Sequence, residues 1–161
     1  MSTNPEAIKK KLQALFEDSY GDYLDTVEGN HSDDEITLDD FAQIIYGDIS
    51  SVQQVKSWPA LAILSNTSTI AVRGEGGVWN IWNTDIELRL FFRHQEVTEL
   101  AKIVDRHLEA LMTFLGDYDT LEGTILGIQG VSFTPTETIL PPGSTMFAKG
   151  LQVLIRTQHK G

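Results

Sequence analysis

Residues 79–93 read WNIWNTDIELRLFFR, and this stretch decides the fold. Its second half alternates between an apolar set and a mainly charged set. The apolar set is Ile86, Leu88, Leu90 and Phe92, and the other is Asp85, Glu87, Arg89, Phe91 and Arg93. Because successive side chains of a strand point to opposite faces, the pattern predicts a long strand with one buried and one charged face. Such a strand aggregates unless it is paired, covered or charged, so it indicates controlled contact with neighbours and no chemistry.

The composition predicts one domain, residues 1–161, divided into an N-terminal helix with an acidic segment (1–57) and a core (58–157). A hydrophobic content of 41% and a charged content of 22% are ordinary for a globular protein. There are no cysteines, which excludes a disulfide scaffold, a thiolate zinc site and a cysteine nucleophile, and which fits folding in a reducing cytoplasm. No apolar run resembles a signal core or a membrane span, so we expect no membrane association.

The net charge of −11 is concentrated in one window. Eleven acidic residues and no lysine or arginine lie between Glu17 and Asp48. This charge disfavours binding to the phosphates of nucleic acids. Either the window is a solvated acidic loop, or it is a surface that repels DNA or meets a basic partner. The candidates for an acidic surface or channel are Asp33, Asp34, Glu35, Asp39 and Asp40.

The N-terminal half predicts a helix and then shorter elements. A helix is expected over residues 5–28, with Gly21 kinking it or ending it early. Residues 41–46 predict a short helix, with a strand as the close rival, and residues 58–64 predict a short core strand. Residues 65–77, rich in Ser, Thr, Asn and Gly, are expected to form a loop.

The C-terminal half predicts a helix over residues 96–115 and strands over 125–134 and 146–157. The resulting order is α-(α/β)-β-β-α-β-β. Strands that cluster around one helix indicate an α+β fold, with a mainly antiparallel sheet of four to five strands packed against two main helices.

No catalytic, cofactor or metal site is expected. The spacing around His31 does not match a calcium loop, His94 is expected at the solvent end of its strand, and His107 is expected to be packed beside the apolar side of its helix. His159 is expected in a frayed C-terminus. Arg73-Gly-Glu-Gly-Gly77 lacks the lysine and the following helix of a phosphate-binding loop.

Aromatic and basic residues around the long strand are the candidates for contact with other subunits. Trp79 and Trp82 stand three apart, so in a regular strand one of them can be buried while the other is exposed. An exposed tryptophan is a typical interface anchor, although two half-buried residues fit equally well. The interface candidates are Arg73, Glu75, Trp79, Trp82, Arg89 and Arg93.

The organisation resembles the tail terminator (tail completion) proteins of tailed bacteriophages, the family of the lambda tail terminator. The resemblance covers residues 58–157, with the first helix in support. It is carried by Trp58-Pro59-Ala60, by the strand Thr84–Phe92, by the helix Leu100–Leu111, by the strand Ile128–Pro135 and by the final alternating strand. The acidic segment from Glu28 to Asp48 departs from the family because it is longer than expected between the first helix and the first strand.

The resemblance implies a structural virion protein, not an enzyme, that forms a homohexameric ring. Such a ring caps the tail tube at its head-proximal end, at the tail–neck junction, after assembly in the host cytoplasm. Its implied partners are copies of itself, the tail tube protein, a neck or stopper protein and, in a contractile tail, the sheath protein. DNA passes through without specific binding, and the acidic window would suit such a channel.

Two alternatives remain open from the sequence. The first is a neck stopper or head–tail connector, which changes the position in the virion. The second is a non-viral adaptor or small-ligand-binding α+β domain, which changes the class of protein.

Overall fold

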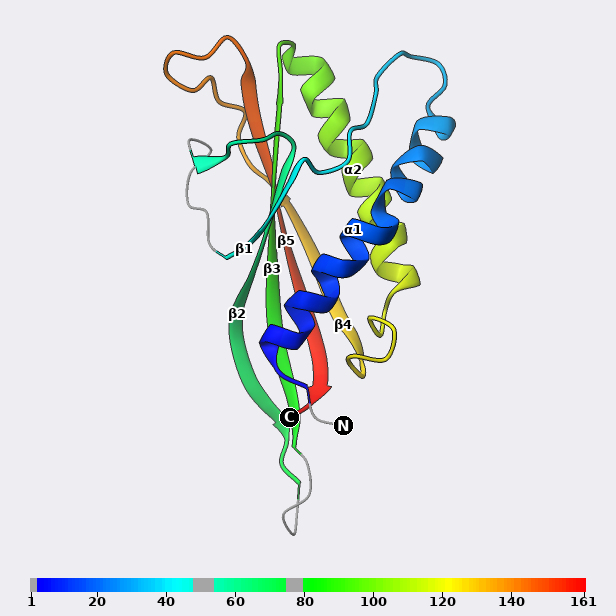
Figure 1. The fold of residues 1–161 in the computed structure, drawn as a ribbon, viewed down its shortest axis with the longest axis vertical. Coiled ribbons are helices and arrows are strands. Elements are labelled where there is room, and N and C mark those ends of the chain that lie inside the picture. The colour runs from blue at the N-terminus through cyan, green and yellow to red at the C-terminus, as the bar shows by residue number, and fades with distance from the viewer. Residues whose placement is uncertain (1–2, 48–53, 75–79) are drawn as a thin grey trace.

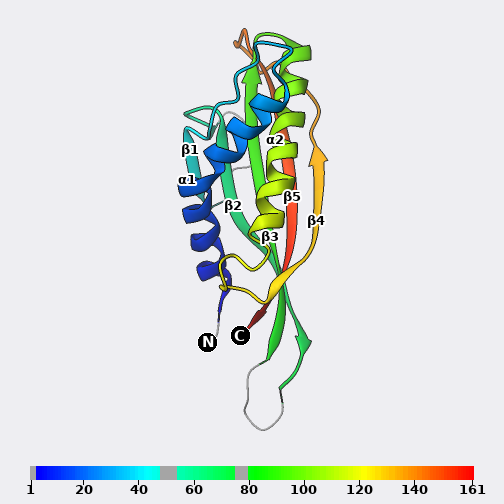
Figure 2. The ribbon, with the colours of Figure 1, turned by 90° about the vertical axis from the view of Figure 1, so that its right-hand side faces the viewer.

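The computed structural model describes residues 3–47, 54–74 and 80–161. The elements in chain order are α1 (Pro5–Asn30), β1 (Gln43–Tyr46), β2 (Ala60–Val72), β3 (Ile81–His94), α2 (Val97–Asp117), β4 (Gly127–Pro135) and β5 (Phe147–Lys160). The strands form one five-stranded sheet in the order β1-β2-β3-β5-β4. Both helices lie on the same face of this sheet (Figures 1 and 2). The α+β class is confirmed, and the sheet is mixed because β1 runs parallel to β2 while the other pairs are antiparallel.

The first helix begins as its sequence predicts. Asn4 caps it by accepting a hydrogen bond from the Ala7 N–H at 2.8 Å, and Pro5 occupies the first turn. The helix continues past Gly21 to Asn30, so the prediction that Gly21 ends it early is wrong. A Cβ at this position would lie 3.1 Å from the Asp40 Oδ2. The glycine therefore allows the segment before β1 to approach the helix closely.

The long strand β3 lies at the centre of the sheet, between β2 and β5. The predicted apolar set is buried: Ile86, Leu88, Leu90 and Phe92 are at most 2% exposed. On the opposite face, Phe91 packs into a second, small cluster with Val55, Ala60 and Ala62, completed by Ile45 and Trp58. Because its neighbours occupy both backbone edges along most of its length, β3 offers other subunits side chains and not a free edge.

The main core lies between the helices and the sheet and is rich in aromatic rings. Phe16 of α1 lies 4.7 Å from Phe114 of α2, measured between ring centroids. Phe92 of β3 lies 4.5 Å from the His107 ring. Aromatic pairs at these separations add about 0.5–1.5 kcal/mol beyond the area that they bury. These contacts fix both helices on the sheet.

Residues 43–46 form a strand, so the preferred prediction of a short helix over 41–46 is wrong and its rival is right. The reason is that consecutive apolar residues serve different clusters. Ile44 packs against the main core, whereas Ile45 packs against the second cluster on the other face. Alternation between two faces requires an extended backbone.

Strand β2 continues to Val72, so the prediction of a loop beginning at Ser65 is wrong for residues 65–72. Polar composition is typical of a loop, but here it marks an exposed part of β2 that pairs with the first half of β3. Register shifts between Ser65 and Ser68 and between Ile70 and Val72 take up the additional residues. Residues 75–77 of the predicted loop lie outside the described residues.

The C-terminus is also more ordered than its sequence predicts. Strand β5 reaches Lys160 and pairs with β3 as far as Ile81. His159 is buried, and its Nε2 lies 2.7 Å from the Thr84 Oγ1. The expectation of a frayed C-terminus around His159 is therefore wrong, because a buried polar partner on β3 holds this histidine in the sheet.

Candidate interaction surfaces

The β2–β3 hairpin projects beyond the end of α1 (Figure 1). We call β2 residues Ser65–Val72 the arm strand; all eight are exposed. Two of its apolar side chains are open to solvent, Ile70 at 37% and Val72 at 53% exposure. Arg73 follows the arm strand and is exposed. Glu75 and Trp79, the next two interface candidates, lie outside the described residues.

Trp82 supports the hairpin from within the subunit. It pairs with His159 across β3 and β5, and it is half-buried. A Cβ at Gly161 would collide with the indole ring, so the ring lies directly against the last residue of the chain. Among the described residues, the tryptophan of this strand therefore packs against the C-terminus and is not a fully exposed anchor.

The face of the sheet opposite the helices, which we call the open face, carries paired charges. Arg89 Nη2 lies 2.9 Å from Glu87 Oε2, and Arg156 Nε lies 3.0 Å from Asp85 Oδ1. Asp85 and Glu87 are mostly buried beneath these arginines, with side chains 14% and 15% exposed. Each of these two pairs is neutral overall, so the centre of the open face is polar without strong net charge.

Arg93, the last of the basic candidates, is exposed, and its guanidinium lies 5.3 Å from the Trp58 ring centroid. At this separation the contact is a cation–π interaction. It covers one side of the second cluster, where Trp58 packs. Substitution of Arg93 would therefore remove a contact with Trp58 within the subunit.

The acidic segment is bound to α2 at several points. The Asp34 carboxylate accepts hydrogen bonds from Arg106 Nη1 at 2.8 Å and Nη2 at 2.5 Å. These bonds hold the pKa of Asp34 well below its usual range. His31 Nε2 also lies 2.9 Å from Glu109 Oε2. We call the segment between α1 and β1, residues 31–42, the acidic strap. It lies against α2, and Arg106 neutralises the charge of Asp34.

The other four acidic candidates differ in exposure and in the residues around them. Asp33, Glu35 and Asp39 are exposed. Asp40 lies beside Gly21 of α1, and partial burial raises its pKa. Glu35 and Asp39 line a pocket, whereas Asp33 does not. The five acids thus have different surroundings, and their role as a channel surface stays a prediction.

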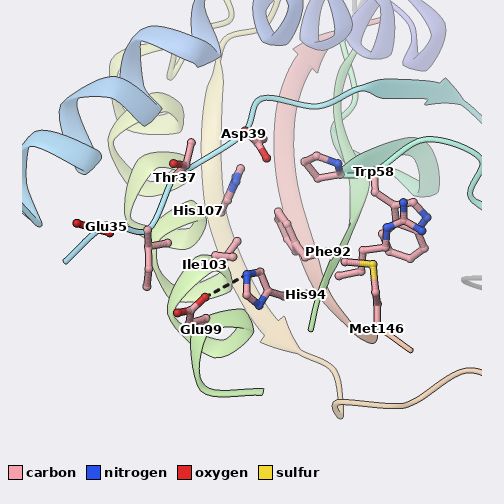
Figure 3. A pocket seen from close by; sticks show the side chains of 13 residues that line it. Glu35, Thr37, Asp39, Trp58, Phe92, His94, Glu99, Ile103, His107 and Met146 are labelled. Atoms are coloured by element: carbon pink, nitrogen blue, oxygen red, sulfur yellow. Dashed lines mark ion pairs between the residues drawn. The ribbon is translucent and has the colours of Figure 1, made fainter. Parts of the chain in front are cut away.

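That pocket has a volume of about 420 Å³ and lies between the strap, α2 and the end of β3 (Figure 3). His94 Nε2 pairs with Glu99 Oε2 at 3.1 Å on its wall. His107 also lines the pocket and is fully buried, as predicted. Its Nδ1 lies 2.9 Å from the Tyr20 hydroxyl, and its Nε2 has no hydrogen-bond partner among the described residues. Burial lowers the pKa of His107 to about 3, so the ring is neutral.

Among the described residues, no group of three or more His, Cys, Asp or Glu side chains is placed to hold a metal ion. No helix in this part of the chain is both long enough and apolar enough to cross a membrane. The described surface offers an exposed arm strand, a polar open face, the pocket beside the acidic segment and an apolar groove beside β4.

Two features of these surfaces were not predicted. Arg106 lies among the apolar positions of α2, and only the neighbouring acidic strap explains an arginine there. Ile70 and Val72 were assigned to a loop, although the alternation Ser68-Thr-Ile-Ala-Val72 was the available signal for a strand.

No protein-family model matches the chain, and no curated protein matches it. Among solved structures, the chain is similar to a chain in the virion of a native gene transfer agent particle. The identity is 7%, the match covers 73% of this chain and 78% of that chain, and the TM-score is 0.28. A TM-score this low does not establish a shared fold, so the match carries no weight in assigning a function.

Proposed function

We propose that this protein is a structural component of a phage-like virion, a tail terminator that acts through surface contacts and without catalysis. In this proposal, copies form a ring, a hexamer in the family it resembles, that caps the tail tube and provides the joint to the neck. The ring would lie at the tail–neck junction after assembly in the host cytoplasm.

The observation that carries the proposal is the projecting hairpin. The strands that carry the resemblance belong to one five-stranded sheet, and the β2–β3 hairpin extends from this sheet (Figure 1). An exposed strand with uncovered apolar side chains is costly for an isolated monomer and is typical of a surface that another chain covers. A ring of copies stacked on a tube supplies such a cover.

The proposal is tested with purified protein and assembled tail tubes from the same particle. Electron microscopy of the mixture should show a ring at one end of each tube, the end that joins the head. Tubes with bare ends, together with a chain that sediments as a monomer in the mixture, would contradict the proposal. A chain that binds portal-side particles and leaves tubes bare would favour the neck stopper instead.

A small-ligand-binding domain is a second candidate because of the pocket. It has about 420 Å³ of space, and His107 in its wall has a buried ring nitrogen that no described residue meets with a hydrogen bond. A reproducible rise in Tm with a metabolite, abolished by His107→Phe and unaccompanied by self-assembly, would favour this candidate. A buried histidine that only packs in the core would produce no such shift.

A further inference from the structure

We propose that the sheet continues from one copy to the next, with the free edge of β2 in one copy pairing with the free edge of β4 in its neighbour. This inference rests on the proposed ring and specifies how its subunits are joined. The partner it requires is a second copy of this chain.

Both strands have an unpaired edge in the described monomer. β1 pairs with β2 only at Ala60–Ile63, so the outer edge of β2 from Leu64 to Val72 has no neighbouring strand among the described residues. β4 is the last strand at the other side of the sheet (Figure 2). Among the described residues, the backbone hydrogen bond on the outer side of β4 is the one that the Ile128 N–H donates to the Asp119 oxygen at 2.8 Å.

Neither edge carries the charges that usually prevent pairing. The thirteen residues of β2 and the nine of β4 include no Asp, Glu, Lys or Arg. Soluble proteins protect long edge strands with charges, prolines or a covering element. Bulges bend both strands locally, and Pro135 stands only at the end of β4. The two edges therefore have the composition of strands that are paired in the functional state.

The directions of the two strands suit a ring. β2 is antiparallel to β3, β3 to β5, and β5 to β4, so β2 and β4 run antiparallel to each other. A rotation about an axis parallel to the strands preserves their directions, so β2 of one copy would meet β4 of the next as an antiparallel pair. Contacts between two different patches of identical subunits close into a ring when the rotation closes.

The two edges also lie at the same level of the sheet. Following the cross-strand register, Ser65 is level with Val131 through Ile86 and Ile155. Thr69 is level with Gly127 through Asn83 and Gln158. A neighbouring copy therefore needs no shift along the strands to bring the two edges together.

An apolar groove lies beside β4 on the helix-covered side of the sheet, the side on which Ile70 of the arm strand lies. The groove has a volume of about 370 Å³, and its apolar lining is Met112, Leu115, Ile128, Val131 and Phe133. Met112 is 58% exposed although it lies on a packed helix. Strand addition gains main-chain hydrogen bonds from the edge and specificity from pockets for alternate side chains.

Ile70 lies on the face of β2 that would meet this groove. It is opposite Trp82, and Ser68, two residues earlier, contacts the buried Thr84 hydroxyl at 3.0 Å. Thr84 belongs to the helix-covered side of β3, because it alternates in phase with Ile86 and Leu88. A rotation keeps the helix-covered faces on one side, so the neighbour's Ile70 would lie at the end of the groove beside α2, one residue beyond the level of Gly127.

Cysteine cross-linking tests the pairing, because the chain has no cysteine of its own. Thr69→Cys is combined in turn with Gly127→Cys, which is level with it, and with Gly130→Cys or Ser132→Cys for a neighbour displaced along the strands, all on the open face by register. Facing Cα atoms of an antiparallel pair lie about 4.5–5.5 Å apart, within disulfide range. Each full-length variant is oxidised with and without tail tubes, and parallel samples are measured by mass photometry.

We expect at least one of these pairs to give covalent species larger than a dimer. The matched control Ser68→Cys with Ser132→Cys places the thiols on opposite faces and should give none. Assembled protein without cross-links from any pair would overturn the strand pairing and leave the ring proposal intact. The single variant Ser132→Cys is oxidised as well. Covalent dimers of this variant would show a twofold contact between two β4 strands and would also overturn the β2–β4 pairing. Monomers by mass in every sample would overturn both proposals.

Discussion

At the scale of single residues, the alternation in β3 is the strongest determinant of the fold. Leu90 is 1% exposed and pairs with Leu61 on one side and Leu151 on the other, all in the core. Leu90→Asp would bury a charge without a partner, and this typically costs more than about 4 kcal/mol. We expect the variant to be unfolded or to lose most of its free energy of unfolding in urea titrations.

Leu154→Asp is the matched control for this prediction. Leu154 lies on the open face of β5 and is 36% exposed. The same change there should cost much less than at Leu90, because the new carboxylate stays in contact with water, although Glu87 on the neighbouring strand adds some repulsion. Equal losses in the two variants would contradict the assignment of the two faces.

His107 makes stability depend on pH. Burial lowers its pKa to about 3, whereas the ordinary value is 6.5. Between these values the unfolded chain binds a proton that the folded chain does not, so the free energy of unfolding falls as the pH drops from 6.5 toward 3. One such site contributes a slope of up to about 1.4 kcal/mol per pH unit.

The histidine's contribution is isolated by comparing the chain with His107→Gln. Urea titrations at about pH 6.5, 5.5 and 4.5 should show a shallower loss of stability in the variant, because glutamine does not titrate in this range. The carboxylates of the acidic strap are common to both proteins. Identical slopes would show that His107 gains access to water before the chain unfolds.

At the scale of elements, the arm strand is the surface on which assembly depends. Ile70→Ser combined with Val72→Ser should change the free energy of unfolding by less than about 1 kcal/mol, because both side chains are exposed. The double variant should nevertheless cap far fewer tail tubes when ends are counted by electron microscopy. Leu140→Ser, at a position 54% exposed and outside the arm strand, is the control and should cap normally.

The elements that could be predicted from the sequence are those whose apolar pattern serves one face. α1, α2 and β3 each bury a single stripe, and periodicity located all three within a few residues. β1 was assigned as a helix because its apolar residues are consecutive, and only two clusters on opposite faces explain them. The end of β2 was not predicted because it is held by backbone pairing with β3 and does not pack against the core. Its sequence therefore shows no apolar periodicity.

The candidate surfaces were less predictable for a similar reason. Asp34, Arg89 and Arg93 each have a partner within the subunit, and these partners come from other elements or the same strand. Composition reports their charge but not these pairings. The groove beside β4 requires α2 and β4 to meet, which no local pattern encodes.

At the scale of the whole molecule, the net charge of −11 determines how the protein meets DNA. Binding to a duplex is driven by lysine and arginine displacing counterions, and this chain has 12 basic against 23 acidic residues. We expect no mobility shift of duplex DNA at about 0.15 M salt, where the Debye length is about 8 Å. A salt-dependent complex in the micromolar range would contradict the idea of DNA passing without binding.

The location of the protein in a particle tests the central claim most directly. Particles assembled with an epitope-tagged full-length chain are labelled with gold-conjugated antibody and imaged by electron microscopy. The proposed function predicts label at the junction between the tail and the head, on the tube side of the neck, and none along the tail. Particles without label, or label confined to the portal side or the distal tail tip, would contradict it.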